Sequence, residues 1–251
     1  MIVVKNSAEL ARMLKATELS AQVLEYAGGF ISSGITTFEI NRLIHDFISK
    51  HGGKPSFLGY NGFKGSACIS VNEELIHGIP SKKKTLNDGD IVSIDVGVYF
   101  DGFHGDNAKT FAVGNISGEA QRLLLVTEKS LYEGIKMALP GNRTGDISSA
   151  VQNCCELSGY HVVKDYIGHG VGAKLHEEPD VPNFGEVGRG PRLVPGMTLA
   201  IEPMVNLTTP SVRILEDGWT VVEANGNLCA HFEHTVAITD GEPLIMTLTS
   251  H

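Results

Sequence analysis

The chain has 251 residues, 42% of them hydrophobic, and a formal net charge of −9. This length and composition are enough to bury a substantial core and do not indicate disorder. The acidic balance gives no electrostatic reason to expect specific nucleic acid or a membrane as a partner, because both attract a basic protein face.

The N-terminal part of the chain predicts two helices. The start MIVVKNSAEL has no long apolar stretch and no small-residue cleavage signal, so we expect a cytoplasmic protein without a membrane anchor. A helix is predicted over about residues 7–32. A clearer one follows in TTFEINRLIHDFISKHGG, where Thr36 and Glu39 have capping-box spacing and Gly52 ends the helix.

Strand-like runs and two further helices follow without a regular order. The helices are predicted at about residues 118–138 and 146–157. The strand-like runs are CISV at 68, DIVSIDVGVYF at 90, MTLAIEPMV at 197, WTVVEA at 219 and HTVAI at 234. Because strands and helices do not alternate strictly, the pattern favours an α+β fold with helices on one face of a largely antiparallel sheet.

The basic run and the cysteines indicate no special chemistry. SKKK, at residues 81–84, is interpreted as a solvated turn. Cys68, Cys154, Cys155 and Cys229 contain no C-x-x-C pair, and two of them are adjacent on a predicted helix. We therefore expect reduced cysteines, with neither a zinc site nor a disulfide framework.

The stretch GHGVGAKLHEEP places His169 and His176 seven residues apart among glycines. Zinc-protease helices instead place two histidines four residues apart around a glutamate. Glycines at this density also argue against a helix interior. The stretch predicts irregular or extended chain that presents the two imidazoles separately to something lying between them.

Two stretches of the chain resemble each other. LNDGDIVSID and LVPGMTLAIE align without a gap and end on Asp95 and Glu202. Downstream of each come Asp-Gly, an aromatic residue and then a second acid in a strand-like context, Asp106 or Glu233. The alternative is chance similarity between two turn-plus-strand units. The acids argue against chance, because Asp95 and Glu202 lie in apolar runs, where carboxylates are rare unless paired or metal-bound.

If the two halves pack as a pseudo-symmetric pair, these four carboxylates converge. They would repel one another unless cations neutralised them. Bridging carboxylates can hold two ions about 3.5–4 Å apart, as in two-metal hydrolases, and His169 is the candidate to complete one shell. Such a shell suits Mn²⁺, Fe²⁺ or Co²⁺ at least as well as Zn²⁺, so the sequence does not determine the metal.

The motifs ELIHGIP, SIDVG, DGFHGDNAKTF, GHGVGAKLHEEP, AIEPM and HFEHT, in this order, resemble those of bacterial-type type I methionine aminopeptidases of peptidase family M24. The resemblance covers nearly the whole chain. It implies one catalytic domain over residues 1–251 with the α+β pita-bread fold, a pseudo-twofold duplicated antiparallel sheet covered by helices, and halves of roughly 1–115 and 116–251. It also implies a hydrolase that uses two divalent metal ions per chain to remove the initiator methionine when the second residue is small.

The resemblance assigns roles to individual residues. The implied metal ligands are Asp95, Asp106, His169, Glu202 and Glu233, with Asp106 and Glu233 as bridges. The implied catalytic residues are His77, which contacts the substrate near its amino end, His176, which holds the tetrahedral intermediate at the carbonyl oxygen, and Glu202, which shuttles the proton. Taken alone, His77 would be interpreted as a structural turn histidine.

The implied methionine pocket contains aromatic and sulfur-bearing side chains. Its residues are Tyr60, Phe63, Cys68 and Trp219, with Phe57 and Leu175 also lining it. Such walls suit a polarizable thioether, although each aromatic residue could equally belong to the core. Better-known bacterial relatives often have Cys, Tyr and Phe in place of Phe57, Phe63 and Leu175, so the chain departs from the family pattern at these three positions. Glu177 and Glu178 are expected in the turn before Pro179, outside the metal shell.

Two other functions compete with this interpretation. An Xaa-Pro aminopeptidase or prolidase shares the implied fold but usually carries an additional N-terminal domain. A pseudoenzyme that only binds proteins or nucleic acid would have lost metal ligands, and all five are present. The expected partners are N-terminal peptides of nascent proteins; a monomer is expected, and a transient ribosome contact is left open.

Overall fold

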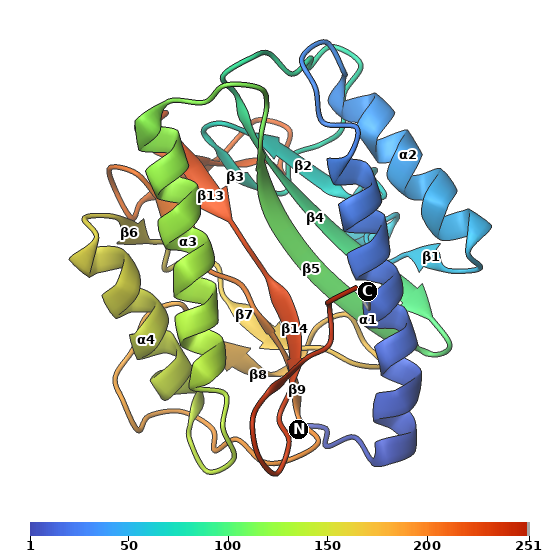
Figure 1. Ribbon diagram of the computed structural model, residues 1–251, viewed down its shortest axis with the longest axis vertical. Helices are drawn as coiled ribbons and strands as arrows, with labels where there is room; N and C mark the ends of the chain where they lie inside the picture. Colours follow the sequence, from blue (N-terminus) through green and yellow to red (C-terminus); the bar gives the residue numbers. More distant parts are fainter. Residues whose placement is uncertain (250–251) are drawn as a thin grey trace.

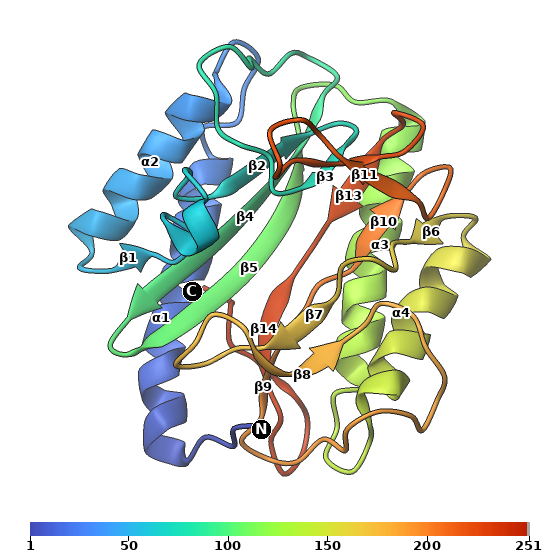
Figure 2. The ribbon, with the colours of Figure 1, turned by 180° about the vertical axis from the view of Figure 1, so that it is seen from behind.

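The helices of the computed structural model, which describes residues 1–249, lie together on one face, with the strands behind them (Figure 1). From the opposite side, the strands are in front of the helices (Figure 2). The α-helices are α1 (Ser7–Gly28), α2 (Thr37–Lys50), α3 (Gly118–Lys136) and α4 (Thr144–Leu157). The predicted α+β arrangement with helices on one face is therefore confirmed.

The strand pairings between the described residues are all antiparallel. One sheet contains β1, β2, β4 and β5; a second has the order β15-β14-β9-β7-β8; two smaller sheets have the orders β13-β10-β6 and β11-β12-β3. The strands are β1 (Lys54–Pro55), β2 (Cys68–Val71), β3 (Glu74–Ile76), β4 (Ile91–Phe100), β5 (Phe103–Ala112), β6 (His161–Val162), β7 (Gly168–Gly170), β8 (Glu177–Val181), β9 (Thr198–Ile201), β10 (Met204–Asn206), β11 (Val212–Ile214), β12 (Val221–Glu223), β13 (Cys229–His231), β14 (His234–Ala237) and β15 (Leu244–Ile245).

The helix predictions differ from the structure mainly at their ends. The capping box of α2 forms as predicted, since Thr36 Oγ1 accepts from the Glu39 N–H and the Glu39 carboxylate accepts from the Thr36 N–H. The first helix ends at Gly28, four residues before the predicted end at 32. Two successive glycines weaken the helix at this point, and a side chain at Gly28 would collide with the Phe111 ring.

One predicted strand is two strands in the structure. The run MTLAIEPMV breaks into β9, which ends at Ile201, and β10, which begins at Met204. Pro203 explains the break, because it has no backbone N–H to donate to a neighbouring strand. Glu202 consequently lies at the interruption, where its side chain is not constrained by the regular alternation of a strand.

Each helix pair packs on its own set of strands. In one buried cluster, Val23 of α1 and Ile44 of α2 lie with Ile69 and Ile94 of β2 and β4. The other main cluster joins α3 and α4 to β9, β10 and β14. The glycines that precede the two aligned strands, Gly89 and Gly196, both adopt left-handed backbone angles, with φ of 97° and 92°. The division at about residue 115 stays a prediction.

Residues 81–84 form a turn, but only part of it is solvated. Lys82 and Lys83 are exposed, whereas Lys84 pairs with the buried carboxylate of Glu74.

All four cysteines are free, as expected. Within residues 1–249, the chain contains no helix that combines the length and hydrophobicity needed to span a bilayer.

Candidate active site

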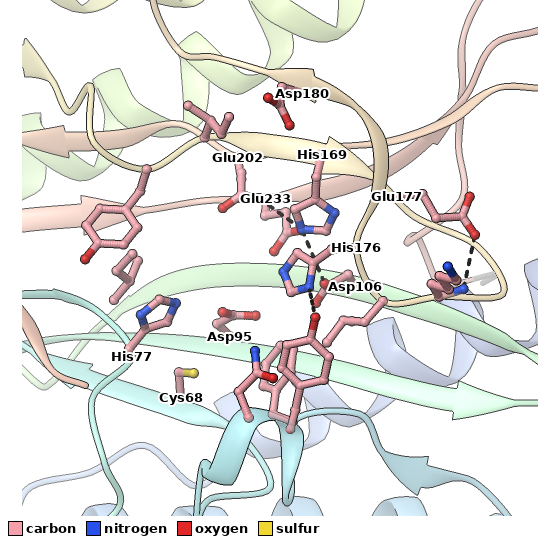
Figure 3. Close-up of a pocket in the computed structure, with 18 of the residues that line it drawn as sticks. Cys68, His77, Asp95, Asp106, His169, His176, Glu177, Asp180, Glu202 and Glu233 are labelled. Carbon is pink, nitrogen blue, oxygen red and sulfur yellow. Dashed lines mark hydrogen bonds and ion pairs between the residues drawn. The ribbon is translucent and has the colours of Figure 1, made fainter. Parts of the chain in front are cut away.

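One cavity of about 920 Å³ contains every site residue predicted from the sequence. Figure 3 shows acidic and histidine side chains gathered within it. They come from segments far apart in the chain, namely β2 to β5, β7 to β9 and the segment between β13 and β14. The fold therefore assembles this site from both helix-and-sheet halves.

Strand register brings the four predicted acids together. In the β4–β5 hairpin Asp95 is opposite Ala108 and Asp106 is opposite Gly97, so the two carboxylates are diagonal neighbours. Glu202 directly follows β9. Glu233 reaches the same space because its N–H donates to the Ala108 carbonyl at 2.9 Å, which attaches its segment to β5.

Burial makes this group of acids costly in the absence of a cation. It raises the pKa of Asp106 to about 7. The pKa values of Asp95, Glu202 and Glu233 are raised well above their usual range, first by burial and then by the neighbouring carboxylates. Asp95 Oδ1 and Asp106 Oδ1 are buried without a hydrogen-bond partner. Oxygen atoms in this state are suited to coordinate a cation.

His169 presents a free nitrogen lone pair to the acids. Its Nδ1 lies 2.8 Å from the Gly170 carbonyl, which can only accept, so the ring hydrogen is on Nδ1. Burial lowers the pKa of His169 to about 3, which keeps the ring neutral. Nε2 then places its lone pair 3.4 Å from Glu202 Oε1. Two acceptors facing each other repel unless a proton or a metal cation lies between them.

The donor set therefore fits a divalent metal. Ligand atoms of Asp106, His169 and Glu233 all lie within 4.8 Å of one another. Asp95 and Glu202 add carboxylates to the same cavity. Close backbone packing requires glycine on both sides of His169, since a Cβ at Gly168 or Gly170 would lie 2.3 or 2.4 Å from a carbonyl oxygen of an adjacent strand.

We predict that Asp106→Asn stabilises the metal-free protein at pH 8. The folded pKa of Asp106 is about 7, above its ordinary value. Protonation of Asp106 therefore stabilises the folded protein: this contribution is fully present below about pH 4 and is lost as the pH rises through about 7. Asparagine avoids that loss, which is on the order of 2–4 kcal/mol.

Thermal unfolding in EDTA at pH 8 and pH 5.5 measures this effect. The variant should unfold several degrees above the wild type at pH 8, and the difference should shrink at pH 5.5. Contributions from buried histidines cancel because both proteins contain them. Added Mn²⁺ should stabilise the wild type more than the variant. A metal-free variant that is less stable than the wild type at pH 8 would contradict the prediction.

His176 is adjacent to His169, contrary to the prediction that the two imidazoles are presented separately. Their ring centroids are 4.2 Å apart. The Tyr60 hydroxyl lies 2.8 Å from His176 Nδ1. Burial lowers the pKa of His176, so its ring is neutral near pH 7. A neutral ring held by Tyr60 can present one N–H into the cavity.

The segment after His176 also differs from the prediction. Glu177 and Glu178 begin strand β8 and do not form a turn before Pro179. The strand forms because Gly170 of β7 pairs with Glu177 across a bulge. Glu177 binds Lys5, with Nζ and Oε2 2.7 Å apart, so its carboxylate is occupied away from the acids.

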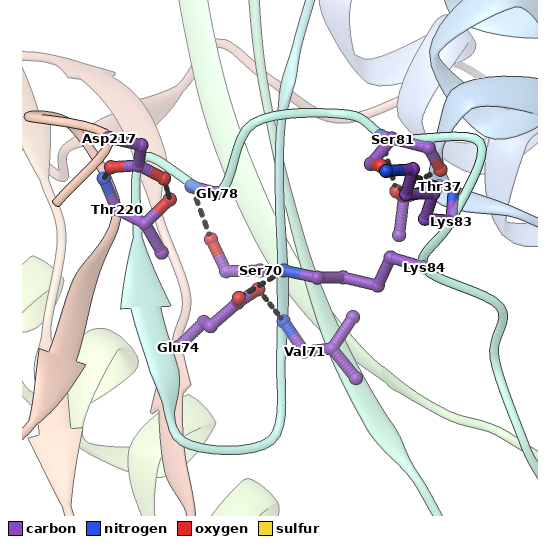
Figure 4. Close-up of polar contacts among 10 residues, drawn as sticks. All are labelled: Thr37, Ser70, Val71, Glu74, Gly78, Ser81, Lys83, Lys84, Asp217 and Thr220. Carbon is purple, nitrogen blue, oxygen red and sulfur yellow. Dashed lines mark hydrogen bonds and ion pairs between the residues drawn. The ribbon is translucent and has the colours of Figure 1, made fainter. Parts of the chain in front are cut away.

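Backbone contacts fix His77 in a strained conformation. Its φ of 59° is rare for a residue with a side chain. Its neighbour Gly78 accepts from the Ile69 N–H at 2.9 Å and donates to Ser70 Oγ at 3.0 Å. Figure 4 shows this second contact beside the Glu74–Lys84 ion pair. Such strain is common at functional sites, and burial lowers the pKa of His77 to about 4.

Apolar side chains line the cavity beside the acids and histidines. They include all six predicted pocket residues, Phe57, Tyr60, Phe63, Cys68, Leu175 and Trp219. The Phe63 and Trp219 rings meet edge to face with centroids 5.2 Å apart. Asp217 holds the backbone of Trp219 by accepting its N–H at 2.8 Å. Burial raises the pKa of the Cys68 thiol well above its usual range, so it remains protonated.

Two residues that the sequence reading did not identify lie at the site. The Tyr166 ring contacts His77 edge to face, with centroids 5.7 Å apart. His231 Nε2 lies 3.5 Å from Glu202 Oε2. The motif HFEHT contained the signal for His231: a residue two positions before Glu233 in extended chain points to the same side.

Comparisons with known proteins agree with this geometry. The family model described as metallopeptidase family M24 matches residues 11–240. The chain is 52% identical to the methionine aminopeptidase of Clostridium perfringens, over 99% of both chains. It is similar to the methionine aminopeptidase structure from Thermotoga maritima, with a TM-score of 0.97, 44% identity and 98% and 99% coverage of the two chains. The prolidase of Pyrococcus horikoshii, with a TM-score of 0.78 and 22% identity, shares the fold, and this chain covers 65% of its length.

Proposed function

The chain belongs to metallopeptidase family M24, and we propose that it hydrolytically removes the N-terminal methionine from proteins whose second residue is small. One observation carries this proposal. The carboxylate and histidine cluster, which suits a metal, shares its cavity with an aromatic and sulfur-lined wall that suits a thioether. The pita-bread fold alone would not separate this function from Xaa-Pro peptidases, since the prolidase shares it.

The family and the cluster of carboxylate and histidine side chains both indicate a metal centre. As a member of a metallopeptidase family, the chain uses divalent metal. We propose two ions, which Asp95, Asp106, His169, Glu202 and Glu233 would hold, with Asp106 and Glu233 as the candidates to bind both. When bound, the ions lower the pKa of water toward neutrality and act as Lewis acids on the substrate carbonyl.

The residues of the chain supply the remaining steps. Glu202 would accept a proton from the attacking water and pass it to the leaving amine. His176, with its Nδ1 engaged by Tyr60, would donate a hydrogen bond to the carbonyl oxygen as negative charge develops there. His77 would hold the substrate near its amino end. The apolar walls would position the methionine side chain and exclude water from the reacting bond.

We expect this protein to release Met much faster than other first residues. Replacing Met by Leu in a Met-Ala-Ser peptide should lower kcat/KM at least ~10-fold, because misfitted apolar groups typically change discrimination by 10- to 200-fold. Charged and β-branched first residues should be rejected. A large second residue after Met should also slow release, because we expect that side chain to occupy a confined space.

Peptide assays with Mn²⁺-, Fe²⁺-, Co²⁺- or Zn²⁺-loaded enzyme test the proposed specificity. An Ala-Pro-Ser peptide, assayed in parallel, distinguishes an Xaa-Pro peptidase. EDTA-treated enzyme controls for contaminating peptidases that need no metal. Release of Ala before Pro at a rate similar to that of Met would favour the prolidase-like alternative and refute this proposal.

The oligomeric state, domain organisation and location of the protein follow from the same reasoning. We propose that it acts as a monomer with one catalytic domain, built from halves divided at about residue 115. The left-handed glycines that precede β4 and β9 support this duplication. Nascent proteins as substrates would place it in the cytoplasm. Analytical ultracentrifugation of the metal-loaded protein tests the monomer directly.

A further inference from the structure

His231 is a buried histidine next to the cluster of metal-binding candidates. It ends β13, and its side chain is 2% exposed. Thr110 fixes its backbone on both sides, because the Thr110 hydroxyl accepts the His231 N–H at 3.0 Å and donates to the His231 carbonyl at 2.9 Å. The backbone of His231 is therefore fixed to β5, and its ring is buried.

The ring nitrogens of His231 have no hydrogen-bond partner by strict geometry among the described residues. Buried polar groups in folded proteins are ordinarily paired. The acceptor that can serve is Glu202, whose Oε2 lies 3.5 Å from Nε2, at the outer edge of hydrogen-bond range. A small adjustment of either side chain would close this contact.

Glu202 lies between two imidazoles, one of which faces it with a lone pair while the other can face it with an N–H. The Nε2 of His169 is 3.4 Å from Oε1 and carries a lone pair, because the hydrogen of that ring is donated from Nδ1 to Gly170. His231 is 3.5 Å from the other oxygen, Oε2. Of these two rings, His231 is the one free to bring an N–H to Glu202.

We propose that His231 is a positioning residue, which donates its Nε2–H to Glu202 Oε2 and so fixes Oε1 on the side of His169 and Asp106. Hydrogen bonds of this kind orient ligating carboxylates and tune the bound metal. The inference rests on the proposed function, because it assumes that Glu202 acts as ligand and base. It goes beyond that function in assigning a role to a residue that does not line the cavity wall.

Metal binding to His231→Leu and His231→Gln tests this role. Leucine fills a similar apolar volume without a donor, and should weaken Mn²⁺ binding about 10- to 100-fold, the usual range for losing such a partner. The glutamine amide can reach the position of Nε2 and keeps a donor. His231→Gln should therefore retain the wild-type affinity within about threefold. Calorimetric titration of the metal-free proteins measures these constants without relying on activity.

His234→Leu is the control for losing a partly buried histidine close to the same strands. His234 Nδ1 lies 2.8 Å from the Thr247 hydroxyl, so the control loses a hydrogen bond outside the acid cluster. It should bind Mn²⁺ with unchanged affinity even if it unfolds at a lower temperature. The proposal is overturned if His231→Leu binds metal as the wild type does, or if His231→Gln loses as much affinity as His231→Leu.

The wild-type protein provides a test that does not depend on the variants folding. Long-range ¹H–¹⁵N spectra of the Zn²⁺-loaded protein report which nitrogen of each ring carries the hydrogen. The proposal requires Nε2–H for His231 and Nδ1–H for His169. Finding the hydrogen of His231 on Nδ1 alone would overturn it. Failure of the wild type to cleave Met-Ala-Ser peptides would instead refute the proposed function and leave this tautomer result intact.

Discussion

Replacing Glu202 with glutamine should lower kcat at least ~10²-fold, the usual loss when general acid-base help is removed. Glutamine keeps the shape of the side chain but cannot accept the proton of the attacking water. It also removes one negative charge from the metal-binding cluster. The fold should survive, because the variant removes a carboxylate whose charged form is disfavoured there by burial and by Asp95 and Asp106.

Steady-state kinetics with Met-Ala-Ser peptide and measurement of bound Mn²⁺ separate these two effects. At saturating metal, a variant that has lost only metal affinity would regain kcat, whereas loss of the base would persist. Glu186→Gln serves as the matched control, since Glu186 is 82% exposed and pairs only with the exposed Arg189 among the described contacts. A Glu202→Gln enzyme that turns over at the wild-type rate would show that the proton shuttle is another group.

Much of the fold was predictable because local signals agreed with the tertiary structure. The capping box at Thr36 and Glu39 set the start of α2, and apolar runs located β2, β4 and β14. The predicted helix boundaries were less accurate. The first helix ends at Gly28, where two successive glycines weaken it, and the Phe111 ring from a distant part of the chain leaves no room there for a side chain.

The acids of the site were predictable because their chemistry conflicted with their surroundings. Asp95 and Glu202 lie in apolar runs, and repetition of the same pattern in two stretches suggested that they meet. The structure places them in one cavity with Asp106, Glu233 and His169. Sequence spacing could not provide the distances within that cavity, because β9 stops at Ile201 and Glu202 leaves the regular strand alternation.

The histidines show where sequence reasoning lacked information. The seven-residue spacing of His169 and His176 predicted separate imidazoles, yet the two rings are neighbours because the chain between β7 and β8 folds back. Likewise, Glu177 looked like a turn residue because its partner Lys5 is 172 positions away in the chain. The alternation in HFEHT placed His231 on the same side as Glu233, but it could not give the distance between His231 and Glu202, on which the role of His231 depends.

Replacing His176 with alanine should lower kcat about 10²- to 10³-fold, the typical effect of losing one donor to a developing oxyanion. KM and bound Mn²⁺ should change little, because the proposed hydrogen bond strengthens mainly in the transition state. The rate should not follow a histidine titration near pH 6.5, since burial lowers the pKa of His176 and keeps the ring neutral. His51→Ala, an exposed histidine at the end of α2, controls for histidine loss in general.

Tyr60→Phe separates the donor role of His176 from simple packing. The Tyr60 hydroxyl, 2.8 Å from His176 Nδ1, favours the tautomer with the hydrogen on Nε2 when it donates. Phenylalanine keeps the ring against His176 but removes that preference, so kcat should fall by less than in His176→Ala while KM for Met peptides is largely kept. If His176 only packs against the substrate, Tyr60→Phe would leave kcat unchanged and His176→Ala would mainly raise KM. Measuring kcat and KM for both variants therefore decides between an electrophilic and a packing role for this histidine.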